Sequence, residues 1–384
     1  MNNEFYNEQT DLSRIKIKLV TDYFITWLNI ISSHWNGKIF YIDLFCGPGC
    51  YEDGNASTPL VILENTLRNE KLLNKVKENL FFWFNDKNKD FIEKLYENIK
   101  RKFASVQREL KNLNNPFQIY TTNYEIPSKE IEDTIKQINA PMFVFLDPWG
   151  YRGISKNLVD IIVDKKMSEC IFFFNYNRIQ GAIFNDSVVE TVSEIFGKEN
   201  LNNLRKRLQT PNLSSYDKEM IILDELVKHF SNNYTRYVVP FCFKKENNQT
   251  SHYIVFVTKH PLGQKIMKSL MAKKSNNNII GGYFAYIPSS PQLSFLTYDT
   301  FDNHKENIKK RLCEKYKGME LKFEELYAQE GYYTPYTVEQ YFQLINELDK
   351  EGKVEVIYSK TKTGRDRKHS PENFYKYGVV KFEE

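Results

Sequence analysis

Short, mostly apolar runs alternate with segments of helical periodicity through the first half of the chain, and this alternation limits the fold more than any other feature. The apolar runs are Lys38–Phe45, Leu80–Phe84, Phe117–Thr121, Pro141–Leu146 and Cys170–Phe174. A strand that is apolar at every position is buried on both faces, as in a parallel sheet covered by helices. The sequence therefore predicts an α/β domain with a parallel sheet.

Two further strands are predicted after a helical insertion at about residues 180–232. They are Arg236–Phe243 and His252–Thr258, and the polar turn Lys244–Ser251 between them indicates an antiparallel hairpin. An amphipathic helix over Asp11–Ile31 precedes the first strand. The expected fold class is a Rossmann-like α/β sheet that ends in an antiparallel hairpin, as in S-adenosylmethionine (SAM)-dependent methyltransferases.

The C-terminal tail has a pattern of its own. Helices are expected at about residues 304–317, 321–329 and 335–350, with Thr334 capping the third. Two strands, Val354–Ser359 and Phe374–Phe382, follow around a basic loop. Three helices and a basic hairpin predict a winged helix-turn-helix domain. We expect a Rossmann-like domain over residues 1–285, a linker over 286–302 and the winged-helix domain over 303–384.

Composition and charge exclude several classes of protein. The net charge of +4 is far below that of a histone-like protein, and no apolar run approaches the roughly 20 residues that cross a bilayer. The five cysteines are scattered, and Cys46 and Cys50 have no third ligand close by in sequence, which argues against a disulfide framework and a metal site. We expect a cytoplasmic protein with no metal.

The first candidate site is the turn that leaves the first strand. Residues 43–49 have the sequence DLFCGPG, so Phe45, Gly47 and Gly49 lie where the backbone could approach a ligand closely. The turn lacks the Lys-Ser/Thr pair of a phosphate loop, which disfavours a nucleoside triphosphatase. The remaining alternative is a simple tight turn.

Acidic residues at two strand ends are candidates for binding the polar ends of a cofactor. Asp43 ends the first strand, and Asp86 follows the second, where an acid commonly binds ribose hydroxyls in Rossmann-type folds. Asp86 could instead cap the following helix, and Asp90 competes with it for the ribose role. We predict Asp43, Phe45, Gly47, Gly49 and Asp86 as SAM-binding residues.

The fourth strand ends in the sequence DPWGY, and open α/β sheets place catalytic groups at such an end. A carboxylate followed by aromatic residues can orient an exocyclic amine while a ring stacks on the base. We therefore predict Asp147, Pro148, Trp149 and Tyr151 as catalytic residues. The alternative is a turn with packed aromatic side chains.

Two segments are candidates for binding nucleic acid. After the fifth strand, Asn175, Tyr176 and Arg178 could line the same cleft, with Arg178 on a phosphate; helix capping by the asparagines is the alternative. The basic loop of the tail could neutralise phosphates or be a solvated turn. Its cations are Lys360, Lys362, Arg365, Arg367 and Lys368.

Three motifs taken together resemble those of the three-Cys-motif partner proteins. They are YIDLFCGPG at residues 41–49, FLDPWGY at 145–151 and FNYNRI at 174–179. The resemblance implies a methyltransferase-like Rossmann fold and a separate partner protein with a three-cysteine, radical-SAM-like motif. The DPWG of this chain differs from the Asp-Pro-Pro-Tyr that is usual in amino-methyltransferases.

The sequence predicts a SAM-dependent methyltransferase that acts on nucleic acid, DNA or RNA, at a base nitrogen and works with a partner protein. Methyl transfer from a sulfonium needs alignment more than acid or base assistance, so few catalytic groups are required. The alternative is a catalytically degenerate module of the same fold that binds nucleic acid or the partner. The methyltransferase hypothesis requires the turns after the first and fourth strands to border one pocket.

Overall fold

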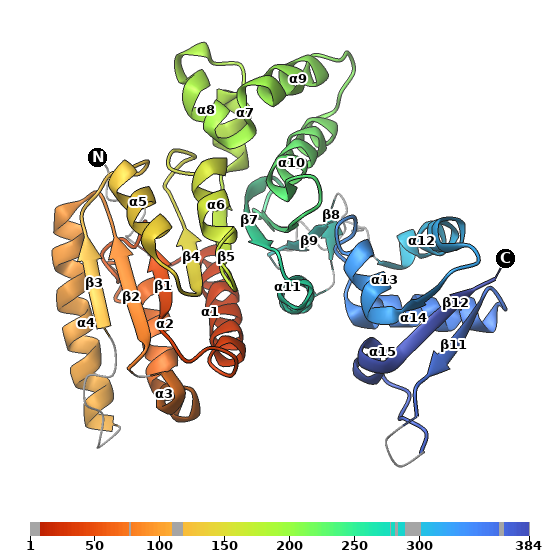
Figure 1. Ribbon diagram of the computed structural model, residues 1–384. Coiled ribbons are helices and arrows are strands. Elements are labelled where there is room, and N and C mark those ends of the chain that lie inside the picture. The colour runs from red at the N-terminus through yellow and green to blue at the C-terminus, as the bar shows by residue number, and fades with distance from the viewer. Residues whose placement is uncertain are drawn as a thin grey trace.

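The computed structural model describes residues 8–76, 78–109, 118–276, 278–280, 283–288, 301–360 and 365–383. The described residues form a nine-stranded sheet with the order β3-β2-β1-β4-β5-β7-β6-β9-β8, and a separate three-stranded sheet near the C-terminus. Figure 1 shows the large sheet flanked by helices and the smaller unit beyond its β9 end.

The first five strands are parallel, and β7 runs antiparallel to both of its neighbours, β5 and β6. The strands are β1 (Ile39–Asp43), β2 (Leu80–Asn85), β3 (Gln118–Thr122), β4 (Met142–Leu146), β5 (Glu169–Phe174), β6 (Tyr237–Lys244), β7 (Thr250–Thr258), β8 (Ile279–Ile280) and β9 (Tyr283–Tyr286). This arrangement confirms the predicted fold class, a Rossmann-like methyltransferase sheet with an antiparallel hairpin.

Helices cover both faces of the sheet because the strands present apolar side chains to both. In β4, Phe143 and Phe145 face one apolar core while Val144 and Leu146 face the other. The first core includes α1 (Asp11–Ile31), α2 (Thr58–Arg68), α3 (Glu70–Val76), α4 (Lys89–Glu109) and α11 (Pro261–Ser275). The second includes α5 (Lys129–Gln137), α6 (Lys156–Val163), α7 (Tyr176–Ala182), α8 (Val189–Phe196), α9 (Lys198–Leu208) and α10 (Ser215–Ser231). Among the described helices, none is long and apolar enough to cross a bilayer.

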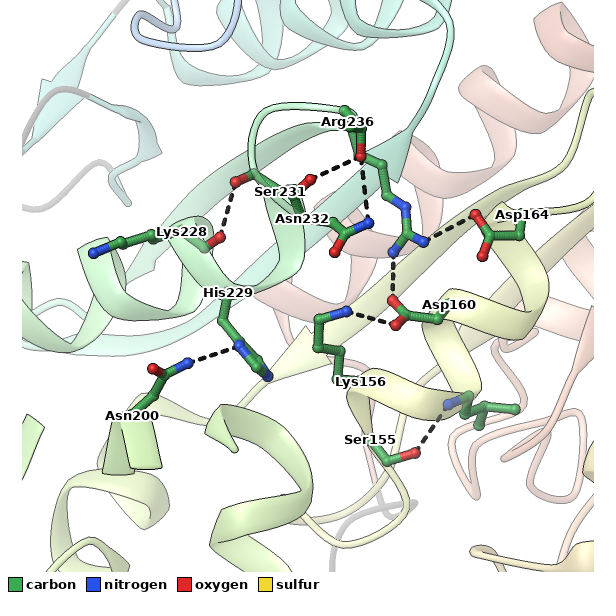
Figure 2. A network of polar contacts seen from close by, with 12 residues as sticks. Ser155, Lys156, Asp160, Asp164, Asn200, Lys228, His229, Ser231, Asn232 and Arg236 are labelled. Carbon is green, nitrogen blue, oxygen red and sulfur yellow. Dashed lines mark hydrogen bonds and ion pairs between the residues drawn. The ribbon is translucent and has the colours of Figure 1, made fainter. Parts of the chain in front are cut away.

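A buried arginine joins the end of α10 to α6, as Figure 2 shows. Arg236 is 2% exposed, and its guanidinium pairs with Asp160 and, at 2.9 Å, with Asp164. Lys156 also binds Asp160, at 2.5 Å. These ion pairs fix the helices that follow β5 against the sheet domain.

His229 of α10 makes the same region sensitive to acid. Its Nδ1 accepts a hydrogen bond from Asn200 Nδ2 at 2.9 Å (Figure 2), so the ring is neutral. Burial, and to a smaller extent Lys156, lowers the pKa of His229 to about 4.

Acidification should therefore destabilise the fold through His229. The pKa of His229 is lower in the folded protein than in the unfolded chain, so the unfolded state binds the proton first and stability is lost as pH falls from about 6.5 towards 4. Because the ring is only half-buried, we expect a loss of about 1–2 kcal/mol. Urea unfolding at pH 7 and pH 4.5 measures it, and His229→Gln is expected to lose less stability than the wild type over that interval. An equal loss in both proteins would contradict this assignment.

The C-terminal unit is a winged helix-turn-helix. Its elements are α12 (Phe301–Tyr316), β10 (Glu320–Lys322), α13 (Phe323–Glu330), α14 (Val338–Lys350), β11 (Val354–Tyr358), α15 (Pro371–Tyr377) and β12 (Gly378–Phe382). The strands form an antiparallel sheet with the order β10-β12-β11. Most of the predicted linker, residues 289–300, lies outside the described residues.

Two details of this unit differ from the sequence-based expectation. The cap of α14 is Thr337, not Thr334, because Thr337 and Gln340 form a reciprocal capping box. The predicted strand from Phe374 is instead helix α15 followed by β12, because Ser370 caps that helix and Pro371 occupies its first turn.

Candidate active site

The site is positioned by the point at which the strand order reverses. β1 pairs with β2 on one side and with β4 on the other, and Asp43 at the end of β1 lies opposite Phe145 near the end of β4. In open α/β sheets, ligands bind outside the carboxyl ends of the strands at such a switch point. The turns after β1 and β4 are therefore neighbours.

Asp86 connects the end of β2 to the glycine turn. Its Oδ2 accepts a hydrogen bond from the Gly47 amide at 3.0 Å, and its Oδ1 accepts one from the Asn88 amide at 2.8 Å. Burial raises the pKa of Asp86, while these two amides act in the opposite direction. A carboxylate has about four lone-pair sites, so both oxygens can still accept from a ligand hydroxyl.

The glycine turn owes its glycines to backbone conformation and packing. Gly47 and Gly49 have φ values of 63° and 86°, which side chains other than glycine rarely adopt. A Cβ at Gly49 would lie 2.7 Å from Cδ1 of Leu95 in α4, which shows how closely the turn packs on that helix.

Asp43 is buried beneath this turn. Its Oδ1 accepts a hydrogen bond from the Phe45 amide at 3.1 Å, and burial raises the pKa of Asp43 well above its usual range. The side chain does not line the cleft described below. Its hydrogen bond with the Phe45 amide stabilises the turn.

A cleft of about 780 Å³ opens over the carboxyl ends of β1 to β4. It is lined by Leu44, Phe45, Asp86, Lys87, Asn88, Lys89, Phe91, Tyr124, Glu125, Ile126, Pro148, Trp149, Gly150, Tyr151, Arg152 and Arg178. The turn after β4 packs directly on the turn after β1, since a Cβ at Gly153 would lie 2.6 Å from Cζ of Phe45. Residues from the β1 and β4 turns thus border a single cleft.

Asp147, predicted as catalytic, is not among the residues that line the cleft, although Pro148 directly after it is, and it is not a free carboxylate. Lys16 of α1 donates to its Oδ2 at 2.5 Å, and the Lys16 and Asp147 side chains are only 5% and 17% exposed. The Lys16 ammonium also lies 5.2 Å from the centre of the Phe173 ring. Sequence reasoning missed Lys16, because a lysine in an amphipathic helix ordinarily faces solvent.

The outer part of the cleft combines an aromatic side chain with two cations. Trp149 is 41% exposed, and Pro148 beside it is buried. Arg178 lies close to the backbone of Gly150, since a Cβ there would be 3.7 Å from one of its terminal nitrogens. Arg152 is exposed on the same wall; it was not among the predicted site residues, although it directly follows the DPWGY motif.

The other residues predicted after β5 have structural contacts. Asn175 caps α7 by accepting from the Arg178 amide at 3.3 Å, which is the helix-capping alternative. Tyr176 is buried in the second apolar core and does not line the cleft.

The predicted basic loop is described in part. Lys360, Arg365 and Lys368 are exposed, whereas Lys362 lies outside the described residues. Arg367 is held by the wing itself, because its Nε donates to the Ser359 carbonyl at 2.8 Å and its guanidinium lies 3.5 Å from the centre of the Tyr377 ring.

The lining of the cleft fits SAM in size and chemistry. Its volume falls within the range of roughly 300–1,000 Å³ that small-molecule sites occupy. Phe91, Tyr124 and Ile126 offer apolar surface for a nucleobase, and Asp86 offers acceptors for ribose hydroxyls. Trp149 and Tyr151 offer aromatic faces to a cation.

Comparisons with known proteins find one family model for the C-terminal part of the chain and several distantly similar solved structures. A family model described as a GMT-like wHTH domain matches residues 287–361. Similar solved structures include precorrin-6y C5,15-methyltransferase from Geobacter metallireducens GS-15, at 10% identity over 62% of this chain and 87% of that chain, with a TM-score of 0.26. Another is a SAM-dependent methyltransferase from Clostridium acetobutylicum ATCC 824, at 14% identity over 44% of this chain and 55% of that chain, with a TM-score of 0.22.

The METTL16 methyltransferase domain is also similar, at 11% identity over 62% of this chain and 66% of that chain, with a TM-score of 0.26. A search of curated proteins gives no match. At these identities the likeness concerns the fold alone. None of the matches named is a three-Cys-motif partner protein, so that resemblance stays a prediction.

Proposed function

We propose that the chain is a SAM-dependent methyltransferase that acts on nucleic acid at a base nitrogen. The observation that carries the proposal is the cleft at the β1–β4 switch point, with the Asp86 carboxylate on one side and the Trp149 ring on the other. One side has the chemistry to hold a nucleoside cofactor, and the other has the chemistry to hold a base.

SAM, when bound, supplies an electrophilic methyl group on a cationic sulfonium. Asp86 would accept from its ribose hydroxyls, and the glycine turn would pass close to it, with Phe45 at the base of the cleft. Asp43 would act indirectly, by holding that turn. Proximity and alignment would provide most of the rate acceleration.

The acceptor base would stack on Trp149, with Arg178 and Arg152 as cations for its phosphates. Within the described residues, neither arginine side chain forms an ion pair. Lys16 engages Oδ2 of Asp147, which leaves Oδ1 to accept from an exocyclic amine. The three-cysteine protein remains the partner that the family resemblance predicts.

A second candidate is a module of the same fold that binds nucleic acid without turnover. The ion pair between Lys16 and Asp147 favours it, since an ammonium neutralises the carboxylate that the catalytic hypothesis uses. Cofactor binding and methyl transfer separate the candidates.

Cofactor binding should stabilise the intact chain. At a SAM concentration about 100 times the dissociation constant, the gain is roughly 2.7 kcal/mol. Asp86→Asn should weaken SAM binding about 10- to 100-fold, because a hydrogen bond to a charged acceptor contributes about 1.5–3 kcal/mol. Thermal unfolding and calorimetric titration measure both effects. The matched control is Asp90→Asn; Asp90, the competing candidate, is exposed on α4 and is not among the residues that line the cleft, so this variant should bind SAM normally.

Labelled methyl transfer to DNA and RNA then tests turnover. Transfer that Asp147→Ala abolishes supports the enzyme and the role of Asp147. SAM binding without transfer to either nucleic acid, with the candidate partner present, would favour the binding module. A folded chain that gains no stability from SAM or from its demethylated product would contradict the proposal.

A further inference from the structure

The Rossmann-like domain contacts the turn of the helix-turn-helix, residues 331–337. Lys268 of α11 donates to the Gly331 carbonyl at 3.0 Å and to the Thr334 carbonyl at 2.6 Å. Gln264, one turn earlier on α11, lies so close to Gly331 that a Cβ there would clash with it. The backbone of the turn is thus bonded to the first domain.

Aromatic contacts extend this joint on both sides. Tyr332 stacks on Tyr237 of β6 with 4.2 Å between ring centres and an angle of 7°. Lys265 of α11 lies 3.6 Å from the centre of the Tyr375 ring in α15. Lys268 itself is buried, and burial lowers its pKa to about 7. A buried, hydrogen-bonded and stacked joint of this kind holds the two domains in one arrangement.

This joint lies directly before the helix that a helix-turn-helix uses to read bases. In that motif, the N-terminal residues of the second helix enter the major groove. The second helix here is α14, which begins at Val338, directly after the bonded turn. Burial lowers the pKa of Lys265 in α11, and the exposed Glu339 in the first turn of α14 acts in the opposite direction.

The charge of α14 also opposes entry into a groove lined by phosphates. Its carboxylates are Glu339, Glu347 and Asp349, and its one ammonium is Lys350. Glu347 pairs with Lys305 and, at 3.7 Å, with Lys309, both of α12. Nucleic-acid affinity comes largely from cations placed on phosphates, and α14 presents the opposite charge.

The wing, whose described residues are 359–360 and 365–369, carries the charge that α14 lacks. Lys360 and Lys368 are exposed, and Asp366 is the acidic residue among them. The Lys368 carbonyl accepts from Asn373 at 2.9 Å, and Arg367 holds the Ser359 carbonyl. These bonds fix the backbone at both ends of the wing, so its cations project from an ordered base.

We infer that the winged-helix domain binds nucleic acid through its wing, on the phosphate backbone, and that α14 does not read base sequence. This inference rests on the proposed nucleic-acid substrate. In Figure 1, β11 and α15, which flank the wing, lie at the lower right, whereas α7, at the carboxyl edge of the sheet, lies at the top. The wing is therefore a second site of contact with nucleic acid, remote from the cleft, and it binds without reading the base sequence.

The test measures fluorescence anisotropy of the full chain with random-sequence DNA and RNA across a range of salt concentrations, without SAM. The variant Lys360→Glu/Lys368→Glu should weaken binding about tenfold or more and lower the salt slope by about 2, one for each lost phosphate contact. Gln343→Ala/Asn346→Ala, on the outward side of α14, should bind as the wild type does. Lys310→Glu, an exposed lysine of α12, is the matched control for charge reversal.

Weaker or sequence-altered binding by the α14 variant, with thermal unfolding unchanged, would overturn the inference. So would an unchanged affinity in the wing variant, or a wild type that binds neither nucleic acid. SAM binding at the cleft is measured separately. Failure of the proposed function would therefore appear as absent SAM binding or methyl transfer, and failure of the wing inference as unchanged nucleic-acid affinity in the wing variant. An acidic protein partner at the wing would show as wing-dependent binding to that protein alone, which also overturns the inference.

Discussion

Replacing Lys16 by Met is expected to lower the free energy of unfolding by about 3–4 kcal/mol. The substitution removes the ammonium that binds Asp147 and leaves a carboxylate, only 17% exposed, without its counter-charge. Methionine keeps much of the length of the lysine stem, so the loss reports the charge rather than a cavity. Chemical denaturation at pH 7 measures it.

A double-mutant cycle separates this ion pair from other effects. Lys16→Met combined with Asp147→Asn should be more stable than Lys16→Met alone, because no unpaired charge remains. The matched control is Lys18→Met on the same helix, an exposed lysine whose loss should change stability by less than about 0.5 kcal/mol. Strictly additive single effects would show that Lys16 and Asp147 are not coupled.

The same substitution matters for the proposed chemistry. Lys16 would be a positioning residue, because it holds Asp147 without touching the acceptor. If so, Lys16→Met should lower methyl transfer while leaving SAM binding near its wild-type value, since Lys16 does not line the cleft. Lys16→Arg, which keeps the charge, should retain more of the transfer than Lys16→Met.

The parallel sheet could be predicted because its signal is local. β1, β2 and β4 are buried along nearly their whole length, and their residues are apolar except at the last positions of β1 and β2, Asp43 and Asn85. The edge strand β3 was wrongly expected to be buried on both faces, because three of its five residues are exposed. The strand ends also located Asp86 and the DPWGY turn, because polar residues begin where the apolar part of each strand ends. Sequence therefore placed both walls of the cleft.

Lys16 could not be predicted because its partner is distant in sequence. It is separated from Asp147 by 131 positions, and helical periodicity alone assigns a lysine to the solvent face. Its burial is explained only by the carboxylate and the Phe173 ring, which the fold brings to it. Tertiary context decides the role of such a residue.

Helix α11 was missed for a related reason. It is packed between the sheet and the winged-helix domain, and its buried residues include Gln264 and Lys268. These polar side chains weaken the apolar pattern by which a helix is recognised. In contrast, α15 carried a readable signal, since Ser370 and Pro371 form a cap followed by a first-turn proline. The aromatic run after them obscured it.

Replacing Arg236 by Met should cost about 3 kcal/mol, because Asp160 of α6 and Asp164 at its C-cap lose the buried cation that they share. Asp160 is the more enclosed of the two, and Lys156 compensates for it only in part. The start of β6 and the end of α10 should lose their attachment to α6, so amide exchange should rise there before it rises in β1 or β4.

Arg14→Met is the matched control, an arginine of α1 whose ion pair with Asp11 is exposed on both sides, at 64% and 69%. Solvent screens such a pair, so its loss should cost no more than about 1 kcal/mol. The contrast tests burial, because the residue type and the substitution are the same in both variants. Equal destabilisation would mean that the cost comes from lost side-chain packing rather than from uncompensated charge. The helices after β5 would then be held by their apolar contacts with α6 and not by the Arg236 ion pairs.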